Sequence, residues 1–113
     1  MKDKLAIITV HAGDVKNLIK TIKSVDSQNF HPDLHLIISK NFDEKILMYK
    51  KEYNRFIFKK DKSIYNAMNI GLKYSKNNFL FFLNSGDYLY SKNIIKIIKK
   101  NISVYKKKCL NFK

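Results

Sequence analysis

The chain has 113 residues, and its 45% hydrophobic and 13% aromatic content excludes an intrinsically disordered protein. Its 23 Lys and Arg residues against 9 Asp and Glu residues leave a net charge of +14, and the stretch after Asp87 holds eight lysines and no acid. Its one cysteine, Cys109, excludes a secreted disulfide scaffold and a four-cysteine zinc site. We therefore expect a single domain in a reducing compartment.

Short apolar runs alternate with segments of helical periodicity along the chain. The β-branched run at residues 5–10 predicts a strand that is buried on both faces. Asp14 then precedes apolar side chains that recur at helical spacing from Val15 to Val25, which predicts a capped helix. The remaining elements are predicted, in chain order, as a strand at 34–38, a helix opened by Asp43 and Glu44 that includes 46–49, a short strand at 55–58, a helix at 64–75, a strand at 79–83 and a last helix that includes 94–98.

This alternation of strands and helices predicts an α/β fold with a mainly parallel sheet that is flanked by helices. Ligands bind to such sheets at the carboxyl ends of the strands. The segments that we expect at this edge are residues 11–14, 39–41, 59–65 and 84–87.

Two of these segments carry polar side chains in high density. The first, residues 84–87, would hold Asp87 rigidly just beyond a buried strand, and one carboxylate with substrate phosphates and waters is a normal Mg²⁺ site. The second, residues 61–69, would begin a helix, and the free backbone N–H groups of a helix start attract anions. Taken alone, each segment is better explained as an ordinary turn or as a capped helix start.

Taken together, the two segments form linked motifs in register, with DKSIYNAMNIG at residues 61–71 and FLNSGD at residues 82–87. These motifs closely resemble those of the family 2 glycosyltransferases, and in particular those of bacterial enzymes that build surface polysaccharides and lipopolysaccharide O-chains. Residues 7–10 and 18–25 are also similar to the nucleotide-binding start of that family. The resemblance covers nearly the whole chain up to Asn101.

The resemblance implies a Rossmann-like GT-A fold that is incomplete at the C-terminus, with a nucleotide-sugar-binding domain over 1–101 and a basic tail over 102–113. It implies an inverting, metal-dependent transfer of a sugar from a nucleotide-sugar donor to a glycan or lipid-linked acceptor. Asp87 would bind Mn²⁺ or Mg²⁺, which would neutralise the charge of the departing diphosphate. The residues that the resemblance places at the donor are His11, Asp61, Lys62, Asn66, Asn69 and Asn84.

The chain departs from the family pattern at several positions. Ser39 stands where the family has the acid of a base-recognising loop, and residues 11–14 replace an aromatic-asparagine pair. His11 is explained equally well as a donor-binding group and as a structural histidine at a strand end. No acid follows Asp87, so the general base of the family is absent, and we expect a chain that is cut short or that works with a partner chain.

Two other functions remain open. One is a non-catalytic relic, or a donor-binding half that needs a partner chain. The other is a basic nucleic-acid-binding module, but we expect no nucleic acid as partner because no RRM, KH or helix-turn-helix signature accompanies the charge. Isoleucines alternate with lysines over residues 94–108, which makes an anionic membrane surface a candidate partner. The expected location is the cytoplasm, with a peripheral position at the inner face of the bacterial plasma membrane.

Overall fold

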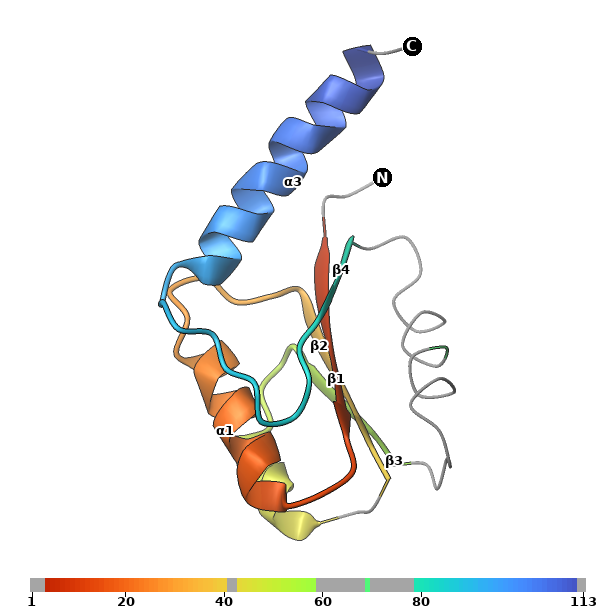
Figure 1. Ribbon diagram of the computed structural model, residues 1–113, viewed down its shortest axis with the longest axis vertical. Helices are drawn as coiled ribbons and strands as arrows, with labels where there is room; N and C mark the ends of the chain where they lie inside the picture. Colours follow the sequence, from red (N-terminus) through yellow and green to blue (C-terminus); the bar gives the residue numbers. More distant parts are fainter. Residues whose placement is uncertain (1–3, 41–42, 59–68, 70–78, 112–113) are drawn as a thin grey trace.

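The computed structural model describes residues 4–40, 43–58, 69 and 79–111, with the side chains of these residues up to Ile102 (Figure 1). The predicted alternation of strands and helices is confirmed in these segments, and the helix predicted over 64–75 lies, apart from Asn69, outside the described residues. The elements are, in order, β1 (Leu5–His11), α1 (Val15–Asp26), β2 (Leu34–Ser39), η1 (Glu44–Tyr49), β3 (Asn54–Phe58), β4 (Phe79–Phe82) and α3 (Ile94–Asn111).

The described strands form one four-stranded sheet in the order β3-β2-β1-β4, and every pairing is parallel. The central strand β1 pairs with a neighbour on each side, so that Ile8 lies opposite both Leu36 and Phe82. The chain adds β2 and β3 on one side of β1 and then returns to place β4 on the other side. The protein is thus a small α/β domain, compatible with a Rossmann-like fold, whose strand order reverses between β1 and β4.

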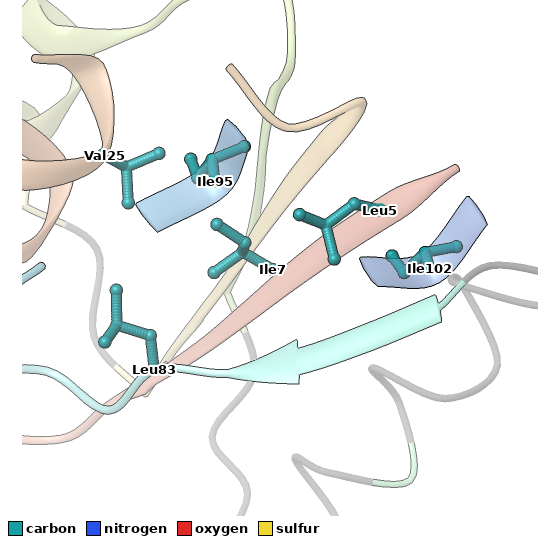
Figure 2. Packing of buried hydrophobic residues seen from close by; sticks show 6 residues of the cluster. All are labelled: Leu5, Ile7, Val25, Leu83, Ile95 and Ile102. Carbon is teal, nitrogen blue, oxygen red and sulfur yellow. The ribbon is translucent and has the colours of Figure 1, made fainter. Parts of the chain in front are cut away.

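The core lies on both faces of β1, as the continuous apolar run predicts. Leu5 and Ile7 point toward Val25 of α1 and Ile95 of α3, and Figure 2 shows these side chains packed together with Leu83 and Ile102. Ile8 points the other way and packs with Leu36 and Ile38 of β2. Because adjacent residues of a strand point to opposite faces, an unbroken apolar run gives a strand that is covered on both sides.

Helix α1 forms as its pattern predicts. The Asp14 side chain accepts a hydrogen bond from the backbone N–H of Lys16 at 2.9 Å and so caps the first turn. Leu18 and Ile22 are fully buried against Ile37 of β2, on the stripe that the helical spacing indicates.

The segment that follows β2 is a 3-10 helix, η1, rather than a longer α-helix. Asp43 caps it as predicted, through a 3.0 Å hydrogen bond from the backbone N–H of Lys45. Only one of its six residues, Ile46, is buried, so little packing energy favours a longer helix. Short connectors of this kind commonly take the tighter 3-10 geometry.

The last helix is longer than the isoleucines alone indicate. It runs for 18 residues from Ile94 to Asn111 and crosses the boundary at Asn101 beyond which the sequence predicts a basic tail. That division into a domain and a tail stays a prediction. Among the helices in the described part of the chain, none has the length and hydrophobicity that a membrane crossing requires.

Candidate functional site

A pocket of about 320 Å³ lies at the carboxyl ends of β1 and β4. These two strands flank the place where the strand order reverses, which is where open α/β sheets bind their ligands. We call it the strand-end pocket. It is lined by Val10, His11, Ala12, Gly13, Asp14, Asn17, Asn84 and Ser85.

His11 joins the two strands that form this pocket. It is the last residue of β1, its Nδ1 lies 2.7 Å from the hydroxyl oxygen of Ser85, and it is only 7% exposed. Burial lowers the pKa of His11 below its usual 6.5, although a hydrogen bond with the backbone of Gly13 and the charge of Asp14 act in the opposite direction. The imidazole is therefore predominantly neutral at pH 7.

The loop Asn84–Asp87 is a tight turn that forms one wall of the strand-end pocket. The backbone N–H of Asp87 donates to the carbonyl of Asn84 at 2.9 Å, and Gly86 has a φ of 97°, which favours glycine. The N–H of Ser85 donates to the carbonyl of Val10 at 3.3 Å, which ties the loop to the end of β1.

A row of polar side chains on α1 holds the chain that follows β4. Thr21 is fully buried; its hydroxyl accepts from the N–H of Gly86 at 2.9 Å and lies 2.7 Å from the carbonyl oxygen of Asp87, to which it donates. Farther along the helix, Ser24 accepts from the N–H of Leu89 at 3.2 Å. Gln28, which lies just beyond the end of α1 at Asp26, continues the row and accepts from the N–H of Ile95 at 3.1 Å.

This row could not be identified from the sequence, since each of these bonds joins residues more than sixty positions apart. The sequence signal for the row was the spacing of its polar residues. Thr21 and Ser24 are three residues apart and so lie along one side of α1, and Gln28 follows four residues later, just beyond the end of the helix.

The structure brings two of the predicted site residues together and separates a third. His11 and Asn84 both line the strand-end pocket. Asp87 is exposed and lines an adjacent pocket of about 480 Å³, together with Phe82 and Tyr88. Asn69 is exposed, whereas Asp61, Lys62 and Asn66 lie outside the described residues.

A smaller pocket of about 220 Å³ lies on the other side of His11, between the ends of β1 and β2. Ser39, which replaces the acid of the family pattern, lines it together with Asp43. The carboxylates of Asp14 and Asp43 therefore both lie at this edge of the sheet. Residues 11–14 were predicted at this edge, but Asp43 was predicted only as the start of a helix. A cap residue that directly follows a strand in an α/β fold lies at the ligand edge, and this signal was available.

The side-chain oxygen atoms at this edge determine which metal ion these residues could bind. Within the described segments, no three His, Cys, Asp or Glu side chains gather as a metal-binding group. The available ligands are single carboxylates and amides, such as Asp87 and Asn84. These hard oxygen ligands fit Mg²⁺ or Mn²⁺ when most of the coordination comes from ligand phosphates and water, and they do not fit a site built from protein atoms alone.

Comparison with known proteins adds no assignment to this geometry. No family model matches the chain, and no curated protein matches it. What the site can do therefore follows from its own residues: a neutral imidazole, a serine hydroxyl, two amides and a carboxylate line a pocket that is large enough for part of a nucleotide.

Proposed function

We propose that the chain is the donor-binding domain of a family 2 glycosyltransferase with a GT-A fold. In this proposal it transfers a sugar from a nucleotide-sugar to a glycan or lipid-linked acceptor in the biosynthesis of a bacterial surface polysaccharide. The observation that carries the proposal is the strand-end pocket, which unites His11 of β1 with Asn84 after β4 at the reversal of strand order. The two linked sequence motifs support the same assignment.

The polar lining of the pocket suits a donor rich in hydroxyl groups. Asn17 and Asn84 each offer an amide that can both donate and accept hydrogen bonds, and Asp14 offers a carboxylate acceptor. The neutral imidazole of His11 can form a hydrogen bond with the nucleotide-sugar without adding charge to the pocket. The pocket therefore combines a few placed polar groups with a concave shape, as small-molecule sites usually do.

Asp87 is the residue that would hold Mg²⁺ or Mn²⁺. A divalent metal at this position would stabilise the charge that grows on the departing nucleoside diphosphate. Asp87 is exposed, so its carboxylate is accessible to a metal that is shared with ligand phosphates. The Thr21 hydroxyl holds the backbone of the same loop and so limits where this carboxylate can lie.

In the proposed inverting transfer, the acceptor oxygen bonds to the anomeric carbon while the bond from that carbon to the diphosphate oxygen breaks. The proton of the acceptor hydroxyl must pass to a base, and family members use a carboxylate that follows the metal motif. This sequence has no Asp or Glu after Asp87. That observation favours a second candidate function, a donor-binding half whose base comes from outside residues 1–113.

Mn²⁺-dependent binding of a nucleotide-sugar is the first test. We expect Asp87→Asn to weaken this binding at least about tenfold, because the metal loses its carboxylate ligand. Isothermal titration calorimetry of a panel of nucleotide-sugars, with Mn²⁺ and with EDTA, measures the effect. The matched control is Glu52→Gln, which neutralises an exposed carboxylate in the turn before β3. Failure of every nucleotide-sugar to bind would contradict the donor site, and equal affinities for both variants would contradict the metal role of Asp87.

Release of the nucleoside diphosphate then separates the candidate functions. Slow cleavage of the donor that requires both Mn²⁺ and Asp87 is expected of a transferase domain. Binding without cleavage favours the donor-binding half or a non-catalytic domain. Salt-sensitive binding of DNA that is tighter than binding of any nucleotide-sugar favours the basic nucleic-acid module instead.

A further inference from the structure

We propose that the outer face of α3, together with the neighbouring Phe30, is a binding surface for membranes that contain anionic phospholipids. We call it the α3 surface and define it by Phe30, Lys96, Ile97 and Lys100. The inference does not depend on the proposed glycosyltransferase activity.

Packing fixes which side of α3 is free. Ile95 and Ile102 are buried in the core, and Ile98 packs against the same cluster. The opposite side of the helix is therefore turned outward, and Lys96 and Lys100 are exposed on it. Since these two lysines are four residues apart, they lie next to each other on one face.

Two apolar side chains lie among these lysines without being covered. Ile97 is 53% exposed and Phe30 is 50% exposed. Phe30 is held beside the helix because the backbone N–H of Asn29 donates to the carbonyl of Lys92 at 2.8 Å. The ammonium group of Lys96 lies 5.6 Å from the centre of the Phe30 ring. Lysines and apolar side chains thus form one continuous patch.

Positive charge predominates around this patch. The sequence after Asp87 holds eight lysines and no acid. The nearby Asp33 is paired at its carboxylate with Lys99, at 3.6 Å, on the flank of the helix. Lysines close to an anionic bilayer are each attracted to it, and an aliphatic side chain beside them can enter the interfacial layer. A phosphate backbone would use the lysines but offers nothing to Ile97, which is why we favour a lipid surface over nucleic acid.

The position of α3 in the fold is compatible with this contact. The helix runs past the amino ends of the strands, whereas the strand-end pocket lies at their carboxyl ends (Figure 1). A membrane on the α3 surface would therefore leave the pocket open to water-soluble ligands.

Co-sedimentation of the full chain with vesicles tests the proposal. We expect binding to vesicles made of equal parts phosphatidylcholine and phosphatidylglycerol, and none to phosphatidylcholine alone. The double variant Lys96→Gln with Lys100→Gln should bind the anionic vesicles about 25-fold more weakly, at about fivefold for each lysine. The control is Lys16→Gln with Lys20→Gln, which makes the same change in net charge at the same spacing on α1, where both lysines are exposed. It should stay within about twofold of the wild type, because its lysines lie off the surface.

Three results would overturn the inference. The first is an equal loss in the two double variants, which would assign the binding to net charge alone. The second is binding that does not depend on phosphatidylglycerol. The third result combines two observations: Ile97→Ser binds the anionic vesicles as tightly as the wild type does, and duplex DNA displaces the protein completely from the vesicles. Together they would assign the lysines to a nucleic-acid surface. Circular dichroism of every variant, compared with the wild type, checks that the fold is kept.

Discussion

Replacing Thr21 with valine is expected to lower the free energy of unfolding by about 2 kcal/mol, because two backbone groups of the loop after β4 lose their hydrogen-bond partner. The valine fills nearly the same volume, so packing is kept while the hydroxyl is lost. Within the described part of the chain, the N–H of Gly86 then has no acceptor and the carbonyl of Asp87 has no donor. Urea denaturation of Thr21→Val and of Thr21→Ser measures the effect, and the serine variant, which keeps the hydroxyl, should recover most of the stability.

Hydrogen exchange shows whether the lost stability belongs to the loop. In Thr21→Val the amide of Gly86 should exchange faster than in the wild type, and in Thr21→Ser it should not. Ser24→Ala provides a matched control, because Ser24 bonds to Leu89 beyond the turn and not to Gly86. A Gly86 amide that exchanges equally in all these proteins would show that the loop is held by other contacts. If the loop does loosen, the affinity for Mn²⁺ and a nucleotide-sugar should fall in Thr21→Val as well.

Acid is expected to destabilise the protein through His35, which is the second residue of β2. The side chains of His35 and Thr9 are both fully buried, and the Nε2 atom of His35 lies 2.8 Å from the hydroxyl oxygen of Thr9. The other ring nitrogen has no hydrogen-bond partner in the described part of the chain, so nothing compensates a positive charge there. Burial accordingly lowers the pKa of His35 from 6.5 to about 4.

The sign of the effect follows from this lowered pKa. The folded protein holds the neutral imidazole, so the stabilisation is fully present above pH 6.5 and is lost as the pH falls toward 4 and below. The total loss is about 3 kcal/mol once both states are protonated. His11, whose pKa is also lowered by burial, contributes in the same direction.

Unfolding measured by urea at a series of pH values between 7 and 4 tests this expectation. His35→Gln keeps a polar partner for Thr9 but cannot titrate, and its stability should depend less on pH than that of the wild type. The control is His31→Gln, which removes an exposed histidine and should keep the full pH dependence. If the wild type and His35→Gln respond equally to acid, the titration of His35 does not contribute to acid unfolding.

Elements with a continuous local signal could be predicted from the sequence. The apolar run of β1 and the helical stripe of α1 each contain enough residues to decide the period, and Asp14 marks the helix start. The parallel sheet and its ligand edge followed from the alternation of these elements. The shorter segment after Asp43 carried one buried side chain, so its pattern could not distinguish a 3-10 helix from an α-helix.

Contacts between distant segments could not be predicted. The apolar run at 34–38 predicts a buried strand around His35, but it does not indicate that Thr9 of the neighbouring strand is the polar partner of the imidazole. Likewise, Asn84 and Asp87 belong to one motif, but the turn at Gly86 sends them to two different pockets. Backbone geometry of this kind is set by Thr21 on another element.

The pairing of β1 with β4 has a consequence for how the protein folds. Ile8 pairs with Leu36 across a short loop, but it pairs with Phe82 only after a much longer one has closed. We therefore expect β1, α1 and β2 to associate first, and β4 to join them late. The strand-end pocket is made from the ends of β1 and β4, so it exists only once this last step is complete. A ligand that occupies the pocket would then stabilise the attachment of β4, and this stabilisation would rise with the logarithm of the ligand concentration once the pocket is nearly saturated.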